Sequence, residues 1–599
     1  MKTSQLILMS LLLAGLMTRF SSADELPEGY WSLQQASEIL AKTRSITLDP
    51  DTSSLTTAEK AATENLIQAG IIFNRLYEDS LHPQALESLA ELKRLGAKGG
   101  QQAAALLDIY YRSKGPITTD LDNQRVAFVP VNPEEPGKNV YPPGITTEDL
   151  DSFLSRNPAL VSEFLNLRTV VRDSSAENLT RDLQILEQYP MLDGLHPGLR
   201  ERLESLQSHH SDAPWYALPY SVRWAPEIIR AYGFINAAAN DLKEEDPDLA
   251  DYLFLRARDL LTDNYEAGDA AWVRGKFRHL NAQIGSYEVY PDSLYGVKSF
   301  WSMNVLVRDT EKSNELSEAL EGLQAIQDSL PVGAGRTIQQ DIPVGVYNIL
   351  ADFGQSRGGN TATILPNDRA HTRKYGRTIL LRYNIMTHPE LFESKQEAFK
   401  AAVKPQFADD LTLDGPFYRT LWHEVGHYLG VDQTASGQDL NEALSPWGSH
   451  YEELKADLVS GFTSAHLNKT GVMGDRVYRS VQAASVLRVL QKNQPRTKEQ
   501  PYQTMQLMQM NYFLEHGFLS FDPVDASLDI HYERYQDVIR SMMEEVLKIQ
   551  QQGDSQLAAE FINQYITWTP ELHERLAKRL RDSSKYRFLT VRYKALADQ

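Results

Sequence analysis

The stretch LWHEVGHYLG, residues 421–430, carries two histidines four positions apart, with a glutamate directly after the first. It belongs to a longer segment, residues 417–429, that has no proline and only Gly426 as a weak helix former, and Gly430 supplies a stop. Residues four apart lie on the same face of a helix. The stretch therefore predicts a helix that presents His423 and His427 on one side.

Two imidazoles in this arrangement can bind one Zn²⁺ ion. Glu424 is rotated by about 100° from His423 on such a helix, which puts it beside a metal rather than on it. There a carboxylate can hold and deprotonate a water molecule. The competing interpretation is a chance match on a surface helix, and a third ligand is needed to separate the two.

That ligand is predicted from YEELKADLVS, residues 451–460, a second amphipathic segment reached through the polar loop 431–449. Glu453 is expected to be the third zinc ligand. Asp457 lies one turn further on the same face, where it could orient a ligand histidine through its free ring N–H, and Glu452 is a weaker candidate for similar support. Alone, this cluster would be read as a solvated acidic face. Beside the histidine pair, a catalytic zinc site is favoured.

The composition is that of an ordinary globular protein: 599 residues, 42% hydrophobic and 23% charged. A formal net charge of −20 argues against binding to nucleic acids and to anionic membranes. The sequence contains no cysteine, which excludes disulfides, thiolate metal sites and cysteine catalysis. Oligomeric state is not predicted.

The first residues have the form of a secretory signal peptide. A lysine at position 2 precedes an apolar run, residues 6–17, and the small residues SSA follow, so we expect cleavage after Ala23. A membrane anchor is the alternative, but this run is shorter than the roughly 20 residues that span a bilayer. The mature protein is thus expected to be exported, and periplasmic if the source is a Gram-negative bacterium.

Hydrophobic spacing predicts a helix-rich protein with a modest sheet in its middle third. Helical patterns cover residues 30–125 and, after a proline-rich break, continue to about residue 275. After about residue 390 the sequence is again almost entirely helical. Four strand-like stretches lie between them, at residues 284–292, 299–309, 342–354 and 361–366. The fold class is α+β, predominantly helical.

The sequence resembles the dipeptidyl peptidase III family of zinc metallopeptidases. Besides the metal motif, the segments that carry the resemblance are GSYEVYPDSLYGVKSFWSMNVLVRDTEKS (285–313), LPND (365–368), EELKADL (452–458) and the tail EVLKIQQQ…AKRL (545–580). The resemblance implies two lobes around a cleft, one helical and catalytic and the other with a small mixed β-core. After the signal peptide, residues 1–23, the expected ranges are 24–312 for the N-terminal lobe, 313–395 for a connecting segment and 396–599 for the zinc-binding lobe.

Carried over residue by residue, the resemblance implies that His423, His427 and Glu453 bind one zinc ion. It makes Glu424 the general base. It further implies that Tyr290 donates its hydroxyl proton to the developing oxyanion, that Glu288 receives the free amino terminus of the substrate, and that Asn367 hydrogen-bonds to the same end.

The sequence departs from the family pattern at three places. Its metal histidines are four apart, whereas most members have one more residue between them. Ile364 precedes LPN where many members have asparagine, so one amide that would hold the peptide amino terminus is missing. Tyr502 stands where members carry a transition-state histidine. It can donate a hydrogen bond but carries no positive charge. His516 and His531 are interpreted as ordinary surface histidines.

The favoured function is hydrolysis of short peptides, with release of dipeptides from the amino terminus. Ile364 and Tyr502 keep an aminopeptidase or an oligopeptidase with another cleavage register as an alternative. A non-catalytic zinc-containing peptide-binding protein is the alternative from another class, but binding alone does not require a base at Glu424. Imidazole and carboxylate ligands also accept cobalt or manganese, so the spacing does not fix the native metal.

Overall fold

The structure is a computed structural model that describes residues 26–122, 124–133, 137–208, 213–289, 291–320, 322–333, 335–338, 344–365, 374–376, 378–497 and 500–597. The predicted signal peptide, residues 1–23, lies outside the described residues. Within them, no helix is long and apolar enough to cross a membrane.

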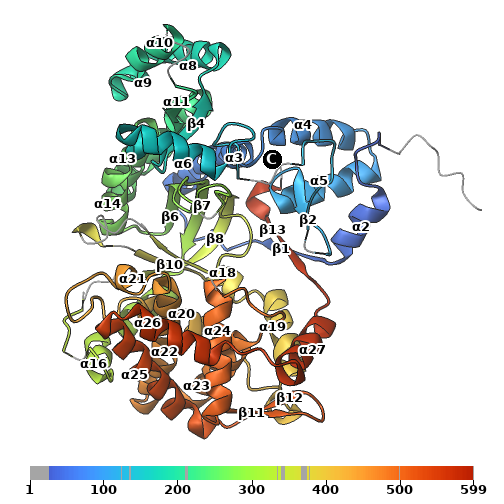
Figure 1. Ribbon diagram of the computed structural model, residues 1–599, viewed down its shortest axis with the longest axis vertical. Helices are drawn as coiled ribbons and strands as arrows, with labels where there is room; N and C mark the ends of the chain where they lie inside the picture. Colours follow the sequence, from blue (N-terminus) through green and yellow to red (C-terminus); the bar gives the residue numbers. More distant parts are fainter. Residues whose placement is uncertain are drawn as a thin grey trace, which may run out of the picture.

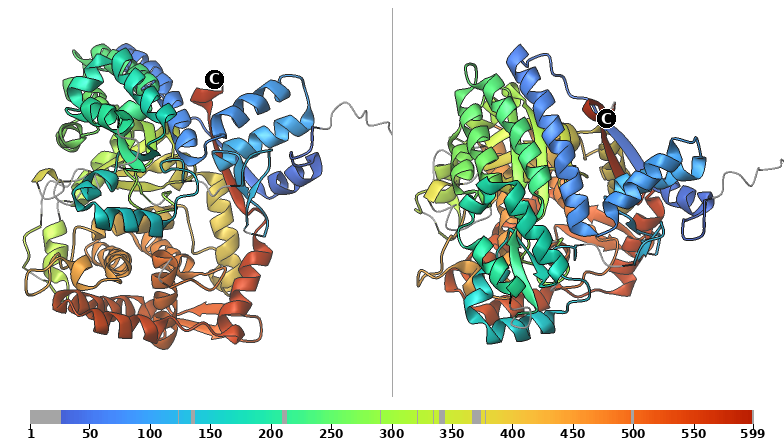
Figure 2. Two further views of the ribbon diagram at one scale, coloured as in Figure 1. Left: turned by 45° about the horizontal axis from the view of Figure 1, so that its top comes forward. Right: turned by 90° about the horizontal axis from the view of Figure 1, so that it is seen from above.

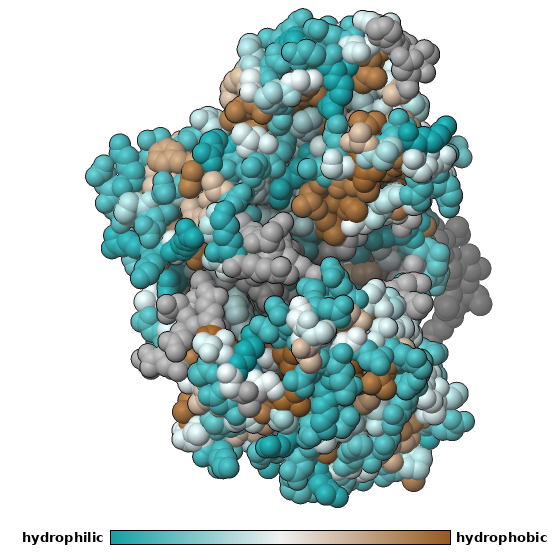
Figure 3. All heavy atoms as spheres, turned by 60° about the vertical axis from the view of Figure 1, so that its left-hand side comes forward, coloured by the Kyte–Doolittle hydropathy of each residue, from teal (hydrophilic) through white to brown (hydrophobic). Residues whose placement is uncertain are grey.

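The chain forms two lobes, one above the other in Figure 1. The upper lobe contains a five-stranded sheet with helices packed around it, and the lower lobe consists almost entirely of helices. A space-filling view shows the surface hollowed between the two lobes (Figure 3). This architecture confirms the predicted fold class of a helix-rich α+β protein with a small mixed sheet.

The five-stranded sheet has the order β6-β7-β8-β10-β9. Its strands are β6 (Leu280–Ser286), β7 (Trp301–Arg308), β8 (Val344–Gly354), β9 (Ala362–Leu365) and β10 (Thr378–Arg382). β8 and β10 run parallel, and all other neighbours are antiparallel. Almost every residue of β6 and β7 is buried, so both faces of these strands are covered.

The long helix α3 (Thr57–Leu81) packs on this sheet. Its start is fixed by a capping box in which Thr56 and Glu59 exchange side-chain-to-backbone hydrogen bonds. Phe73 meets the ring of Trp301 edge-on at 5.5 Å between centroids. At Gly70 a Cβ atom would lie 2.3 Å from the ring of Phe353, so only glycine allows this approach. The helix predicted in this region is thus confirmed.

The remaining elements of the upper lobe follow in sequence order. They are α6 (Thr147–Arg156), a 3-10 turn (Pro158–Leu160), α7 (Val161–Phe164), β4 (Thr169–Asp173), α8 (Ala176–Gln188), α9 (Pro190–Leu195), α10 (Leu199–Ser208), β5 (Trp215–Pro219), α11 (Tyr220–Arg223), α12 (Ala225–Leu242), α13 (Pro247–Thr262) and α14 (Glu266–Arg274). β4 and β5 form a two-stranded antiparallel pair, and α12 packs along α3.

The first described residues form a separate helical unit beside the upper lobe, seen in blue in Figures 1 and 2. It contains α2 (Leu33–Ala41), β1 (Thr43–Leu48), α4 (Ala85–Gly96), α5 (Gln101–Ser113) and the hairpin β2 (Ile117–Thr119) and β3 (Arg125–Ala127). A small hydrophobic core of its own holds this unit together, with members from α2, α4, α5 and the segment after β3: Ala36, Ile39, Leu92, Leu106, Ile109, Tyr110, Phe128 and Val129.

The last strand of the chain returns to the first. β13 (Phe588–Tyr593) pairs in parallel with β1, with Thr43 opposite Phe588 and Leu48 opposite Tyr593. Figure 1 shows this red strand leaving the lower lobe and running beside the blue one. β13 falls within the range 396–599 that is expected for the zinc-binding lobe, and nothing local in its sequence identifies β1 as its partner.

The lower lobe begins after β10. Its elements are α18 (Tyr383–Met386), α19 (Pro389–Ala402), a 3-10 turn (Pro405–Phe407), α20 (Asp414–Gly426), α21 (Leu440–Ala443), α22 (Gly448–Lys469), α23 (Asp475–Val489), α24 (Pro501–Glu515), the hairpin β11 (Leu519–Asp522) and β12 (Ser527–Ile530), a 3-10 turn (Tyr532–Arg534), α25 (Tyr535–Gln552), α26 (Ser555–Tyr565), a π-helical turn (Pro570–Glu574) and α27 (Arg575–Ser583). A final 3-10 turn (Lys594–Leu596) follows β13.

Two helices connect the sheet with the lower lobe: α15 (Thr310–Leu320) and α16 (Leu323–Ser329). The side chain of Gln327 on α16 accepts a hydrogen bond from the backbone N–H of Gly430, at 2.8 Å, and donates one to the carbonyl oxygen of the same residue, at 3.3 Å. The connecting segment is therefore hydrogen-bonded to Gly430, which follows the histidine motif. After α16 the chain returns to the sheet in β8.

One predicted strand is wrong in its bounds. The strand expected at residues 284–292 starts earlier, at Leu280, and ends at Ser286. Beyond it the chain turns around Asp292, whose carboxylate accepts backbone hydrogen bonds from residues 294, 295, 297 and 298. A side chain that satisfies four backbone N–H groups competes with the sheet ladder, so Glu288 lies in a loop and not on a strand.

Candidate metal centre

Helix α20 ends at the histidine motif. His423 lies in its last turn and is buried, and His427 caps the helix with dihedral angles that are still helical (φ −65°, ψ −21°). The two imidazoles therefore keep the spacing of one helical turn, with ring centroids 5.0 Å apart. α20 ends at Gly426, before the stop that the sequence predicts, and Gly430 takes a left-handed φ of +87° in the turn that follows.

Gly426 sets the distance between α20 and α22. A Cβ atom at this position would lie 2.9 Å from the carbonyl oxygen and 3.1 Å from the Cα atom of Ala456, and 3.3 Å from the side chain of Val459. Because glycine has no side chain, the two helices can cross almost in backbone contact. This close crossing brings Glu453 of α22 to the histidines of α20.

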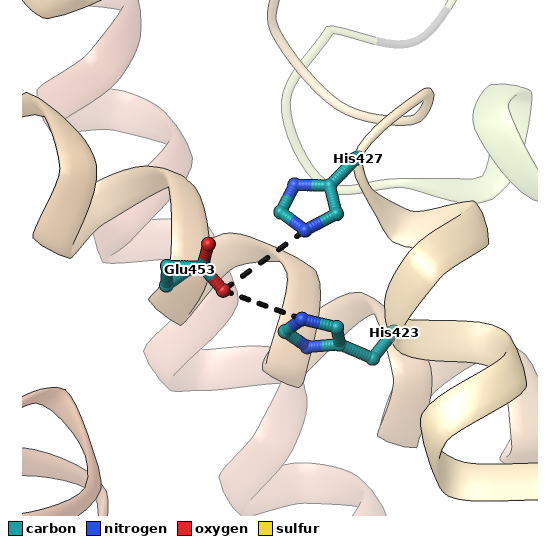
Figure 4. Close-up of side chains that lie close together, drawn as sticks. All are labelled: His423, His427 and Glu453. Carbon is teal, nitrogen blue, oxygen red and sulfur yellow. Dashed lines mark ion pairs between the residues drawn. The ribbon is translucent and has the colours of Figure 1, made fainter. Parts of the chain in front are cut away.

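The three predicted zinc ligands come together at the crossing (Figure 4). Glu453 Oε2 lies 3.3 Å from His423 Nε2 and 4.0 Å from His427 Nε2, and the potential ligand atoms all lie within 4.8 Å of one another. A tetrahedral zinc ion with bonds of about 2.0–2.2 Å separates its ligands by roughly 3.3 Å. The cluster thus has the donor types and the spacing that zinc requires.

Glu453 Oε2 is buried and accepts no hydrogen bond within the described part of the chain. Buried carboxylate oxygens without a partner are rare, because leaving one unpaired costs free energy. A cation held between this oxygen and the two imidazole nitrogens would supply the missing partner. This observation, made on the atoms of the site itself, fits a bound metal ion.

Carboxylates hold the far side of both imidazole rings. His423 Nδ1 lies 2.7 Å from Asp457 Oδ1, and His427 Nδ1 lies 2.8 Å from Glu452 Oε1. Each contact fixes the ring so that Nε2 faces Glu453, which is the arrangement that supports metal ligation. Asp457 and Glu452 therefore lie where the sequence predicts them.

Positive charges surround these two carboxylates. Asp457 is buried and bonds to Arg419, to Arg488 Nε at 3.2 Å and to Gln509 Nε2 at 3.0 Å. Burial alone would raise the pKa of Asp457, but the two guanidinium groups and His423 outweigh it and hold that pKa well below its usual range. Asp457 therefore stays ionised.

The same balance applies to the neighbouring groups. Burial would raise the pKa of Glu452, but Lys455, 2.9 Å away, and His427 lower it below the usual range. Burial would lower the pKa of His423, but Asp457 and Glu453 raise it to about 9. The imidazoles are thus embedded in ionised carboxylates, a setting that favours a cation.

Tyr502 on α24 reaches the same cluster. Its hydroxyl donates a hydrogen bond of 3.0 Å to Glu453 Oε1, the oxygen that points away from the histidines, and its side chain is half exposed. Glu453 therefore has one oxygen on Tyr502 and the other between the imidazoles. Burial, followed by the charge of Glu453, raises the pKa of Tyr502, so the phenol keeps its proton.

A cavity of about 1120 Å³ opens over the cluster, between the two lobes. Its lower wall includes His423, Glu424, His427 and Tyr502. Its upper wall consists of Glu288, residues 360–363 with the start of β9, and Gly376. The cavity is larger than the roughly 300–1,000 Å³ typical of small-molecule sites, so it has room for an extended ligand such as a short peptide.

Two predicted site residues, Tyr290 and Asn367, lie outside the described residues. Ile364 belongs to β9, where it pairs with Ile379. The two histidines interpreted as surface residues do not line the cavity: the ring of His516 packs at a tilt against that of Tyr512, with centroids 3.9 Å apart, and His531 is bound to Ser520 at 3.1 Å.

Sequence reasoning missed four residues that support the site. Arg419 precedes His423 by four positions and Lys455 follows Glu452 by three, so helical spacing could have identified both. Arg488 and Gln509 come from α23 and α24, and no spacing in the sequence connects them with Asp457.

No family model matches this chain. The solved structures that share its fold include dipeptidyl peptidase III from Caldithrix abyssi, with a TM-score of 0.77 and 22% identity over 93% of this chain and 99% of that one. Another is dipeptidyl-peptidase III from Corallococcus sp. strain EGB, with a TM-score of 0.73 and 21% identity over 94% of this chain and 98% of that one. The chain therefore has the dipeptidyl peptidase III fold, which confirms the fold that the resemblance implied.

One curated protein is also similar, Nudix hydrolase 3 of Arabidopsis thaliana, with 24% identity over 464 residues. The match covers 75% of this chain and 56% of that protein. This chain thus spans little more than half the length of that relative, and the activity in the relative's name is not carried over.

Proposed function

We propose that this protein is a zinc-dependent peptidase that hydrolyses short peptides and releases dipeptides from their amino terminus. The observation that carries this proposal is the buried oxygen of Glu453 that faces the two histidine nitrogens, in a cavity between the lobes that Glu424 also lines. The dipeptidyl peptidase III fold of the whole chain supports it.

His423, His427 and Glu453 would hold the zinc ion, one per chain, which when bound polarises the scissile carbonyl and makes water more acidic. The carboxylate of Glu424 takes a proton from the attacking water and passes it to the nitrogen of the leaving amine. Asp457 and Glu452 keep the imidazole rings in the orientation that this chemistry needs.

The upper wall of the cavity would position the peptide. Glu288 offers a carboxylate to the free amino terminus of the substrate. β9 is an edge strand that pairs with β10 on one side and lines the cavity, so an extended peptide can add to it as a further strand. This is the edge that we propose for strand addition. The roles of Tyr290 and Asn367 stay predictions from the resemblance.

Export and the division into lobes also stay predictions. We propose that residues 1–23 are a signal peptide and that the mature protein works in the periplasm or outside the cell. The ranges 24–312, 313–395 and 396–599 remain the proposed lobes and connecting segment. The native metal is proposed to be zinc, and loading the purified protein with zinc, cobalt or manganese tests that choice.

An aminopeptidase or oligopeptidase with another cleavage register is the second candidate. It is favoured by Ile364, which stands where the family pattern has an amide for the peptide amino terminus. A peptide-binding protein without turnover is the third candidate. Binding alone gives Glu424 no role, and Glu424 lines the cavity next to both histidines.

Peptide digestion separates these candidates. The purified protein without residues 1–23 is incubated with zinc and unlabelled penta- to octapeptides, and the products are read by mass spectrometry, with Glu424→Gln as the matched control. Dipeptides from the amino end, absent with the variant, support the proposal. Single residues or internal fragments point to another register. If both proteins leave every peptide intact, the peptidase function is wrong.

A further inference from the structure

The hydroxyl proton of Tyr502 is engaged in a hydrogen bond to a candidate metal ligand. A phenol has one proton to donate, and in this structure it is donated to Glu453 Oε1 at 3.0 Å. The hydroxyl therefore supports a metal ligand, and while this bond is made it does not donate to the oxygen of a substrate. The proposed reaction needs a group that stabilises negative charge on that oxygen, and a cation in the wall of the cavity could do so.

Four cationic side chains line the cavity in the described part of the chain: Arg336, Arg419, Lys455 and Arg488. Arg336 uses both terminal nitrogens, on Asp432 and on the carbonyl oxygen of Tyr428. The ammonium group of Lys455 is bound to Glu452 and is almost fully buried.

The other two cations share a single carboxylate. Arg419 and Arg488 both bind Asp457, one on each of its oxygens. Arg488 also lies in the field of Glu453, so both carboxylates keep its guanidinium group charged. The side chain of Arg419 is 8% exposed and that of Arg488 is 29% exposed, so Arg488 is the member of this pair that faces the cavity.

The contacts of Arg488 leave one edge of its guanidinium group available. Nε binds Asp457 Oδ2 at 3.2 Å, and the amide oxygen of Gln506, when turned toward the guanidinium, lies 3.2 Å from both Nε and Nη1. Nη2 has no hydrogen-bond partner among the described residues. The group is therefore fixed on one side, by Asp457 and Gln506, and free on the other.

We propose that Arg488 donates from Nη2 to the carbonyl oxygen of the scissile peptide bond and stabilises the negative charge that develops there. This inference rests on the proposed peptidase function. A guanidinium group is charged at every working pH and is held in place before the reaction, which are the properties of an effective oxyanion donor. In this chain it supplies the charge that Tyr502 lacks.

A donor of this kind acts mainly on the transition state. Its removal typically lowers kcat by about 10²–10³-fold and leaves the affinity for the uncharged ground state nearly unchanged. A residue that only orients Asp457 would instead weaken zinc binding, by roughly 10–100-fold for a partner of a metal ligand. The two roles therefore differ in what they change.

The test compares Arg488→Met with Arg476→Met, an exposed arginine at the start of the same helix that contacts neither the cavity nor the cluster. Three quantities are measured on zinc-loaded protein: zinc content, affinity for a phosphinate peptide that mimics the anionic tetrahedral state, and kcat. Affinity for the unmodified peptide is measured by calorimetry in the Glu424→Gln background.

With Arg488→Met we expect full zinc content, unchanged affinity for the unmodified peptide, and a loss of about 10²-fold in both kcat and phosphinate affinity. Arg476→Met should match the wild type. Unchanged phosphinate affinity, or an equal loss for both ligands together with loss of zinc, would overturn the proposal and leave Arg488 a positioning residue.

Arg488→Gln carries the same test if Arg488→Met does not fold, since it can keep a donor for Asp457 while it removes both the charge and Nη2. Failure of the proposed function looks different from failure of this inference. In the first case the wild type cleaves no peptide, and in the second it does so and Arg488→Met cleaves equally well.

Discussion

Replacing Gly426 with alanine tests whether the close crossing of α20 and α22 builds the metal centre. The new Cβ atom would lie 2.9 Å from the carbonyl oxygen of Ala456, about 0.5 Å short of ordinary van der Waals contact, and 3.1 Å from Cα of the same residue. Both are backbone atoms, so no side-chain rotation relieves the clash and the helices must separate.

Two effects of opposite sign determine the change in stability. Alanine is favoured over glycine within a helix by about 0.5–1 kcal/mol. Overpacking against a fixed backbone costs about 1–3 kcal/mol. The cost of overpacking exceeds the gain in helix propensity. We therefore expect the free energy of unfolding, measured without metal, to fall by about 1–2 kcal/mol.

The larger effect should appear in zinc affinity. Separating the helices by a few tenths of an ångström moves Glu453 away from the histidines, and metal sites tolerate distance errors of only about ±0.2 Å. We expect zinc affinity to fall by roughly tenfold or more. Unfolding in urea with a chelator measures the first quantity, and competition with a chromophoric chelator measures the second.

Gly233→Ala is the matched control. Gly233 lies inside α12, is exposed, and a Cβ atom there meets nothing within 4 Å. This variant should be more stable by about 0.5–1 kcal/mol and bind zinc as the wild type does. If Gly426→Ala behaves like Gly233→Ala in both assays, the role assigned to the helix crossing is wrong.

Three further predictions concern buried charges. Asp457→Asn leaves two guanidinium groups without their shared carboxylate, so urea unfolding should show a loss of about 3–5 kcal/mol; stability equal to the wild type would contradict this. Burial raises the pKa of Asp263 to about 7, above its unfolded value, so its stabilising contribution is complete below pH 4 and lost as pH rises through 7. Asp263→Asn should therefore gain stability relative to the wild type between pH 5 and pH 8, and a pH-independent difference would exclude this titration. Tyr593→Phe removes the hydroxyl that donates to Asp352 Oδ2 at 2.9 Å and should cost about 1–3 kcal/mol, with no change in zinc content.

The three candidate metal ligands could be placed together from the sequence because their geometry is local. His423 and His427 share one helix face by their spacing alone, and Glu453 lies in a second short motif whose helical pattern is equally clear. Helix periodicity depends only on neighbours in sequence. The long helices of both lobes could be predicted for the same reason, because each depends on residues that are close in sequence.

Strand bounds were less predictable because they depend on contacts made elsewhere. The strand near Glu288 ends at Ser286 because Asp292 folds the following loop, and hydrophobic alternation does not report such a competing side chain. β1 and β13 are short and depend on a partner from the other end of the chain, so neither has a local signal.

The polar and charged partners of Asp457 could not be predicted either, because they also depend on contacts between distant segments. Arg488 and Gln509 reach it from α23 and α24, across gaps of 31 and 52 residues. Only the packing of these helices on α22 brings them to one carboxylate, and helix packing is not encoded by the spacing of any motif.

The parallel pairing of β1 with β13 has a consequence for how the chain is made. Synthesis runs from the amino end, so β1 emerges long before its partner β13. The blue helical unit can assemble its own core early, yet its attachment to β13 waits until residues 588–593 have been made. A product of premature termination before Phe588 would keep helices α20 and α22 but leave the edge of β1 without its partner strand. Exposed strand edges of this kind promote aggregation.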